Sequence, residues 1–196
     1  MRILYLHGLA SSKLANTCQV LRDNLVNDEI LSIDIPMNPK EAMNKIMKTI
    51  YEFHPSLIIG NSLGGFYATF FEGPWKILIN PALRPNVEIT KILGGYGKFS
   101  YLKEREDGSN TFIYDKEDEK EFEHYVKLFK ESIIDFDVIS QTYALFGSED
   151  DIVNDKEYFD TLFDSSHSSM MHCGHRITND NILNDIIPLI EKLRNH

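Results

Sequence analysis

The chain has 196 residues, of which 42% are apolar and 26% are charged, as expected for one globular domain with a substantial core. Its formal net charge of −10 argues against nucleic acids and anionic membranes as partners, because both attract clustered lysine and arginine. No run approaches the roughly 20 apolar residues that span a bilayer, the apolar N-terminal run is too short for a signal peptide, and two cysteines do not suggest a secreted scaffold. We therefore expect a cytoplasmic protein.

Short β-like runs alternate with helical patterns along the chain. Strands are predicted, in chain order, at residues 2–6, 29–35, 57–61, 76–80, 142–146 and 167–171. Helices are predicted where apolar residues share a face: Leu14, Cys18, Leu21 and Leu25; Met43, Ile46, Met47 and Ile50, after a cap at Asn38; and Ile182, Ile186, Leu189, Ile190 and Leu193 in a closing helix at 178–193. This alternation predicts an α/β fold, a mostly parallel sheet of about six strands flanked by helices on both faces.

The motif Gly60-Asn61-Ser62-Leu63-Gly64 lies where the third predicted strand meets a helical run that continues to Glu72. A G-x-S-x-G motif at a strand-to-helix junction is the nucleophile elbow of α/β-hydrolases. The turn is so tight that the residues two positions either side of the serine must be small. It exposes the hydroxyl of Ser62 above the sheet and places the N–H of Leu63 at a helix N-terminus, where it can face a developing negative charge. The sequence thus predicts a minimal α/β-hydrolase fold with Ser62 as its nucleophile.

The segment 81–141 interrupts the alternation before the fifth predicted strand. It shows no convincing central strand, and residues 103–137 contain 12 acidic and 6 basic side chains, or −6 of the net charge. Apolar residues recur within it at helical spacing: Phe122, Tyr125, Val126, Phe129 and Ile133. We expect a single domain, 1–196, with a small helical insertion whose charges face solvent and whose apolar residues are the candidates for a small cap.

A serine hydroxyl needs a base to remove its proton and a third group to orient that base. In this fold the acid follows the serine in the chain and the histidine comes last. After the fifth predicted strand comes the acidic loop Gly147-Ser148-Glu149-Asp150-Asp151-Ile152-Val153. We favour Asp150, which lies three residues after the glycine that ends the strand. The neighbouring Glu149 and Asp151 are the alternatives.

The histidine is expected on the loop after the last strand, where the chain reads His172-Cys173-Gly174-His175-Arg176. We favour His175, because Gly174 allows the sharp turn that would carry the imidazole over Ser62. His172 is the alternative, otherwise interpreted as a packed or partly exposed side chain. A metal site at His172, Cys173 and His175 is set aside, because it lacks the further spaced ligands of zinc sites.

The turn that ends the first predicted strand, His7-Gly8-Leu9-Ala10-Ser11-Ser12, is the expected second part of an oxyanion hole. Gly8 lets the backbone turn so that the N–H of Leu9 points at a substrate carbonyl, beside the N–H of Leu63. His7 is interpreted as a structural residue whose ring binds nearby loops, with a role as catalytic base as the alternative.

Three blocks of this sequence resemble the small YqiA/YcfP-type esterases of the α/β-hydrolase superfamily. They are Tyr5-Leu6-His7-Gly8 with Ser11-Ser12, Gly60-Asn61-Ser62-Leu63-Gly64-Gly65-Phe66-Tyr67-Ala68-Thr69, and Asn80-Pro81-Ala82-Leu83-Arg84-Pro85. The resemblance covers nearly the whole chain and implies a carboxylesterase-like Ser-His-Asp enzyme acting on short acyl esters or thioesters. Relatives usually have Gly where this chain has Cys173, and often Ala-Phe where it has Arg176-Ile177. The segment 88–137 is the least similar, so the resemblance implies nothing about the substrate pocket.

The predicted function is therefore a serine hydrolase with Ser62 as nucleophile, His175 as base and Asp150 as its orienting acid. The N–H groups of Leu9 and Leu63 would hold the oxyanion, and water would hydrolyse the acyl-enzyme. The expected partner is a small-molecule acyl ester or thioester, with no metal, no cofactor, no nucleic acid and no membrane. The alternatives are a non-catalytic binding module, which would carry a damaged triad, and a peptidase or other serine hydrolase. The sequence leaves acyl length and oligomeric state open.

Overall fold

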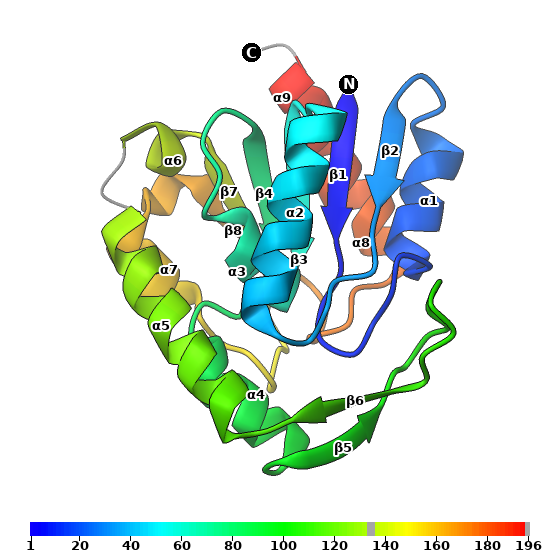
Figure 1. Cartoon of the computed structure of the whole chain (residues 1–196). Coiled ribbons are helices and arrows are strands. Elements are labelled where there is room, and N and C mark those ends of the chain that lie inside the picture. The colour runs from blue at the N-terminus through cyan, green and yellow to red at the C-terminus, as the bar shows by residue number, and fades with distance from the viewer. Residues whose placement is uncertain (133–135, 195–196) are drawn as a thin grey trace.

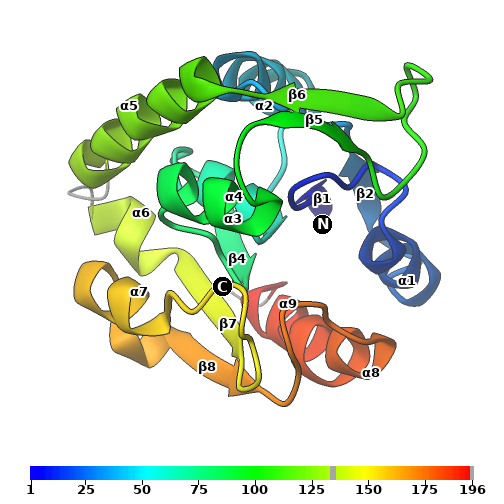
Figure 2. The same cartoon turned by 90° about the horizontal axis from the view of Figure 1, so that it is seen from below.

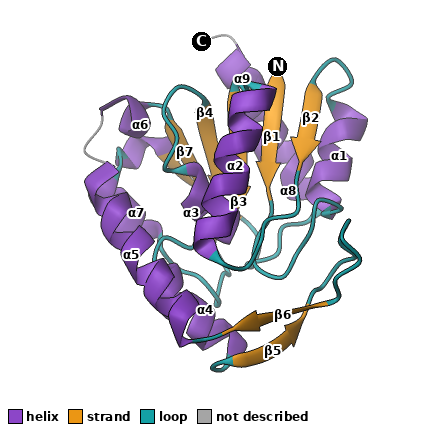
Figure 3. Ribbon diagram, in the orientation of Figure 1, coloured by secondary structure: helices purple, strands orange, loops and turns teal. Residues whose placement is uncertain are grey.

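The computed structural model describes residues 1–132 and 136–194. Within them, six strands form one parallel sheet in the order β2-β1-β3-β4-β7-β8 (Figures 1 and 3). These strands are β1 (Arg2–Leu6), β2 (Glu29–Ser32), β3 (Leu57–Asn61), β4 (Trp75–Ile79), β7 (Thr142–Gly147) and β8 (Ser168–Met171). The predicted α/β architecture with a six-stranded, mostly parallel sheet is confirmed.

Helices cover both faces of the sheet, as Figure 2 shows when the strands are viewed nearly end-on. The helices are α1 (Asn16–Asn24), α2 (Pro39–Phe53), α3 (Leu63–Ala68), α4 (Pro85–Leu93), α5 (Lys116–Ser132), α6 (Phe136–Ser140), α7 (Lys156–Leu162), α8 (Asn179–Asn181) and α9 (Ile187–Arg194), with a 3-10 turn η1 (Ser165–His167) and a π-helical turn η2 (Ile182–Ile186). Because side chains alternate along a strand, the sheet separates two apolar clusters. One packs α2, α3, α5 and α7 on the sheet, and the other packs α1, η2 and α9.

The strand order changes direction at β1, which lies between β2 and β3. The chain leaves β1 for β2 on one side and then crosses to β3 on the other. In open parallel sheets, the loops at such a point separate at the carboxyl ends of the strands and leave a crevice. The turns after β1 and β3, which carry the predicted oxyanion and nucleophile residues, therefore meet at this edge.

The predicted strands β1 and β3 match the structure residue for residue. The second strand is shorter than predicted, since it ends at Ser32 rather than at residue 35. Beyond it, the carboxylate of Asp34 accepts the N–H of Lys13, and the N–H of Ile35 donates to the ring of His7. These side-chain contacts take the place of ladder hydrogen bonds.

Two residues predicted on buried helix faces are exposed. Leu14 is 54% exposed because α1 begins only at Asn16. Met47 is 57% exposed because the buried face of α2 carries Ala42 and Ile46. Met47 is the residue after Ile46, and successive residues do not share a helix face. The predicted cap is present, with the side chain of Asn38 accepting two N–H groups of the first turn.

The insertion is not purely helical, which corrects the sequence prediction for 81–141. It contains α4, α5 and α6, but also an antiparallel hairpin of β5 (Gly97–Ser100) and β6 (Thr111–Tyr114). The hairpin lies beyond the carboxyl ends of the parallel strands (Figures 1 and 2). Of the apolar residues predicted in α5, Phe122 and Phe129 are fully buried, and Ile133 lies outside the described residues.

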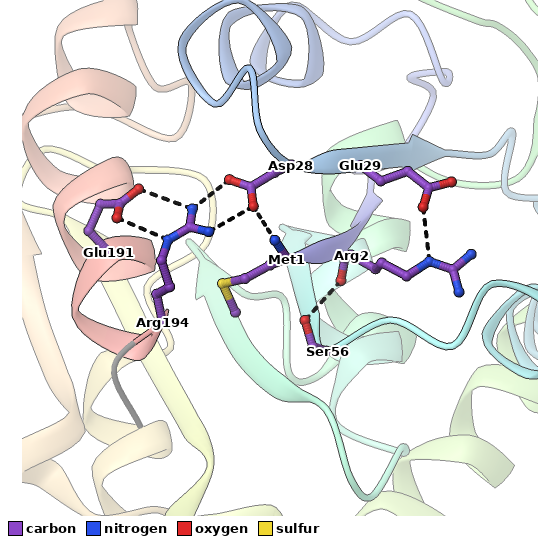
Figure 4. A network of polar contacts seen from close by, with 7 residues as sticks. All are labelled: Met1, Arg2, Asp28, Glu29, Ser56, Glu191 and Arg194. Atoms are coloured by element: carbon purple, nitrogen blue, oxygen red, sulfur yellow. Dashed lines mark hydrogen bonds and ion pairs between the residues drawn. The ribbon is translucent and has the colours of Figure 1, made fainter.

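The start and the end of the described chain are joined by an ionic network (Figure 4). The buried carboxylate of Asp28 accepts hydrogen bonds from the ammonium group of Met1 and from the guanidinium of Arg194, which also binds Glu191. The hydrogen bonds of Arg194 first, and then the ammonium group, lower the pKa of Asp28 against the opposing effect of burial. No helix within residues 1–132 and 136–194 is long and apolar enough to cross a membrane.

Candidate active site

Ser62 occupies a strained turn between β3 and α3. Its backbone has φ 52° and ψ −117°, a conformation that a non-glycine residue adopts only when its surroundings impose it. The Ser62 N–H donates to the carbonyl of Ile79 at 2.8 Å, and its carbonyl accepts the N–H of Ala82 at 3.1 Å. A Cβ at Gly60 would lie 2.6 Å from the carbonyl carbon of Gly64, so no larger residue fits there. The sequence motif thus folds into a sharp elbow that places Ser62, which is largely buried, directly after the end of β3.

Ser62, His175 and Asp150 form a continuous hydrogen-bonded chain. His175 Nε2 lies 3.0 Å from Ser62 Oγ, and His175 Nδ1 lies 2.8 Å from Asp150 Oδ2. The side chains of Asp150 and His175 are only 3% and 15% exposed. A carboxylate on Nδ1 fixes that nitrogen as the donor, so Nε2 is free to accept the proton of the serine hydroxyl.

Asp150 is placed as an ionised acceptor. Burial raises its pKa, but the hydrogen bond from His175 and the N–H groups of Val153 and Ile152 outweigh burial and lower the pKa below the ordinary value. Both of those N–H groups lie 2.9 Å from Oδ1, which leaves Oδ2 for the imidazole.

The neighbouring candidates are not brought to the serine. Glu149 and His172 pair with each other at 3.3 Å on the surface, where their side chains are 64% and 89% exposed. Asp151 is also exposed. The structure therefore brings Asp150 and His175 together with Ser62. It leaves the three alternatives exposed on the surface: Glu149, Asp151 and His172.

His7 is buried and hydrogen-bonded on both ring nitrogens. Nδ1 donates to the carbonyl of Gly8 at 2.8 Å, and Nε2 accepts the N–H of Ile35 at 2.9 Å. Burial is the main cause that lowers its pKa to about 4, so the ring is neutral near pH 7. With no free nitrogen, His7 ties the loop after β1 to the loop after β2, in keeping with the structural interpretation made from the sequence.

The two expected oxyanion donors line one cleft. Leu9 and Leu63 both border a cleft that begins at the His7-Gly8 turn. A Cβ built on Gly8 would lie 3.1 Å from the Cβ of Ser62, so one wall of this cleft packs closely against the serine. Within the described part of the chain, the N–H groups of Leu9 and Leu63 donate to no protein acceptor, so both remain available to a developing oxyanion.

Asn80 is a site residue to which the sequence alone assigned no role. It is 1% exposed, has φ 44°, and follows β4 directly. Its Oδ1 accepts the N–H of Gly147 at 2.6 Å, while its Nδ2 donates to the carbonyls of Gly174 and His175 at 3.2 and 3.1 Å. One amide thus joins the strand before Asp150 to the loop that carries His175. The sequence feature that could have indicated this role is a polar asparagine placed between an apolar predicted strand and Pro81.

Among the described residues, no group of three or more His, Cys, Asp or Glu side chains is placed to hold a metal ion. Cys18 and Cys173 are buried free thiols, and burial is the main cause that raises the pKa of each. Neither has the lowered pKa of a reactive cysteine.

A family model described as "Uncharacterised protein family (UPF0227)" matches residues 2–167. A UPF0227 protein of Vibrio atlanticus (strain LGP32) is 30% identical over an alignment of 94 residues, and the match covers 42% of this chain and 52% of that protein. The match therefore spans about half the length of that relative.

Solved structures share the whole architecture at low identity. The monoacylglycerol lipase of Paleococcus ferrophilus superposes with a TM-score of 0.69 at 15% identity, covering 98% of this chain and 93% of that one. Alpha/beta hydrolase domain-containing protein 10 from mouse gives 0.65 at 14%, covering 99% and 89%. The esterase domain of a Rhodothermus marinus protein gives 0.61 at 16%, covering 98% and 85%. At these identities the likeness shows the α/β-hydrolase fold.

Proposed function

This chain belongs to the UPF0227 family, and we propose that it is a serine hydrolase that cleaves carboxylic esters or acyl thioesters. The observation that carries the proposal is the hydrogen-bonded chain from Ser62 Oγ through His175 to Asp150. Ser62 stands on a strained elbow, His175 has an accepting nitrogen toward it, and Asp150 holds the other nitrogen. This is the arrangement that a weak nucleophile needs in order to be activated.

In the proposed reaction, Ser62 Oγ attacks the acyl carbon while His175 Nε2 takes its proton. The carboxylate of Asp150 holds the Nδ1–H tautomer and stabilises the imidazolium that forms. The same proton then passes to the leaving alkoxide or thiolate, which departs as the alcohol or thiol. Water, activated by His175, hydrolyses the acyl-enzyme and regenerates the serine.

The oxyanion of each tetrahedral intermediate would be held by the N–H groups of Leu9 and Leu63. The N–H of Leu63 lies at the N-terminus of α3, where the helix dipole adds to the hydrogen bond. Loss of one such donor typically costs about 10²- to 10³-fold in kcat in serine hydrolases. Supporting this proposal, the structurally similar proteins include proteins named as an esterase domain, a lipase and a thioesterase domain.

A non-catalytic binding module is the weaker alternative, because it would not need an intact chain of three polar groups. A peptidase differs only in the leaving group and is separated from an esterase by substrates. We therefore expect purified protein to hydrolyse p-nitrophenyl acyl esters or acyl-CoA thioesters in preference to peptides.

The test compares the wild type with Ser62→Ala and with Ser148→Ala, an exposed serine close to Asp150 in the chain. Ser62→Ala should lower kcat by about 10⁴-fold or more, since only the oxyanion donors and binding remain. Ser148→Ala should retain wild-type turnover, and all three proteins should melt within a few degrees of one another. Substantial ester hydrolysis by Ser62→Ala, or none by the wild type on the whole panel, contradicts the proposal.

A further inference from the structure

The cleft beside Ser62 is small and mostly apolar. The free space inside it is about 10 Å³, roughly what one water molecule needs, so its own walls nearly fill it. Beyond Leu9 and Leu63, its walls come from Ile35, Met37 and Tyr101. Because Leu63, the residue after the nucleophile, lines this apolar cleft, an acyl chain on Ser62 could enter it only as far as the other walls leave room.

Tyr101 is the residue by which the insertion lines the cleft. It follows β5 directly, and its N–H donates to the carbonyl of Asn110 at 2.9 Å. Its ring packs against Phe112 of β6, with the ring centroids 4.9 Å apart. The next residue, Leu102, donates its N–H to the carbonyl of Ala10 at 2.7 Å, which ties the insertion to the loop that carries Leu9.

Arg105 contacts three of the four segments that border the cleft, all except the one that carries Leu63. Its Nη1 donates to the carbonyl of Ser11 at 3.1 Å, and its Nη2 donates to the carbonyl of Ile35 at 3.1 Å. Its Cζ lies 4.2 Å from the centroid of the Tyr101 ring. The residue is only 6% exposed, so one buried guanidinium joins the loop after β1, the loop after β2 and the insertion.

Asp34 carries the charge opposite to that of Arg105, and it likewise connects the insertion to the loops after β1 and β2. Its two oxygens accept the N–H of Lys13 and the N–H of Glu106, both at 2.7 Å. Burial opposes ionisation, but these N–H groups together with the charge of Arg105 lower the pKa of Asp34. A buried ion of either sign is costly unless partner groups compensate it, so the hydrogen bonds of Asp34 and Arg105 to these segments favour one position of the insertion.

We propose that Tyr101 is a specificity-determining residue that limits the length of the acyl chain, and that Arg105 is the positioning residue that holds it. This inference rests on the proposed function and deepens it. Tyr101 closes the cleft from the insertion, and Arg105 keeps the tyrosine ring and the Leu9 loop in register with Ser62. The enzyme therefore selects short acyl groups because a segment outside the central sheet blocks longer ones.

The first test measures kcat/KM for p-nitrophenyl acetate, butyrate, hexanoate and octanoate. Tyr101→Ala should raise the octanoate-to-acetate ratio at least about tenfold, since even one methylene in an apolar pocket changes selectivity by about 10- to 200-fold. Tyr101→Phe should keep the wild-type profile because the ring is the wall, and Tyr101→Trp should lower the ratio. Leu102→Ala is the matched control, since that neighbouring side chain is 63% exposed.

The second test concerns Arg105. Arg105→Gln should lower kcat for acetate and also reduce the differences in kcat/KM between short and long acyl chains. Both effects are expected because the Leu9 loop and Tyr101 lose their contacts with the guanidinium. Arg105→Lys keeps a positive charge beside Asp34 and should restore part of both effects. A role in stability alone would lower the melting temperature and leave the ratio of kcat/KM between chain lengths unchanged.

The rate of covalent labelling by fluorophosphonates with short and long alkyl chains gives the same comparison without turnover. A wild type that is neither labelled at Ser62 nor active on any ester contradicts the proposed function, and this inference with it. An active wild type whose length profile is the same in Tyr101→Ala and Tyr101→Trp contradicts this inference alone.

Discussion

The role of each side chain near Ser62 follows from its neighbours and not from its type. Three of the seven histidines lie in the segments that surround the site, and each has a different environment. His175 is held between a carboxylate and a hydroxyl, His7 has both nitrogens engaged with backbone groups, and His172 is exposed beside Glu149. Only the first environment leaves a basic nitrogen directed at a nucleophile.

The acidic loop gives a comparative prediction at this scale. Asp150→Asn should lower kcat by about 10⁴-fold, because an amide on Nδ1 favours the wrong tautomer of His175. Asp151→Asn and Glu149→Gln should change kcat less than about tenfold, because neither side chain contacts the imidazole. Steady-state kinetics on one good ester measure all three. A crippled Asp151→Asn beside an active Asp150→Asn would show that the acid had been assigned to the wrong residue.

At the scale of elements, the site is built from loops that only the sheet brings together. Ser62 follows β3, Asp150 follows β7 and His175 follows β8, and the carboxyl ends of these parallel strands lie at one edge. Asn80, at the end of the intervening β4, binds the last residue of β7 and the His175 loop. The buried amide of Asn80 therefore adds a side-chain connection between the acid and base loops to the two backbone hydrogen bonds that the N–H groups of Ser148 and Glu149 donate to Met171 and Cys173.

We expect Asn80→Gly to lower kcat by about 10- to 100-fold with little change in KM, since small misplacements of a catalytic group cost rates of this order. Glycine is the informative substitution because it accepts the φ of 44° without strain, whereas Asn80→Ala adds a backbone penalty. Asn80→Ala should therefore melt below Asn80→Gly while showing a similar kcat. Kinetics and thermal melts of the two variants check this. Wild-type kcat in Asn80→Gly would exclude a positioning role.

At the scale of the whole molecule, the sequence predicts what local pattern encodes and misses what packing decides. The strands β1 and β3 are found residue for residue because buried parallel strands are continuous apolar runs between loop residues. The hairpin β5–β6 is missed because β5 offers Phe99 as its one large apolar residue, after a flexible glycine cluster. The motif spacing likewise indicates Ser62, Asp150 and His175, since each follows a recognisable strand.

The sequence cannot reveal that Arg105 is buried, because it lies in a stretch of charged residues that resembles a solvated surface. The same is true of Asp28 and Arg194, which pair across 166 positions of the chain. Burial of a charge depends on a partner supplied by a distant segment, and no local pattern carries that information. The residues proposed to shape specificity therefore emerge only from the fold.

The most direct test of the central claim is the mass of the protein and its peptides after reaction with a fluorophosphonate. The wild type should gain one adduct, on the peptide that contains Ser62. His172→Ala should react at the wild-type rate, whereas His175→Ala should react at least about 100-fold more slowly, in line with the range expected for loss of a general base. An adduct elsewhere, no adduct at all, or wild-type labelling of His175→Ala would contradict the account.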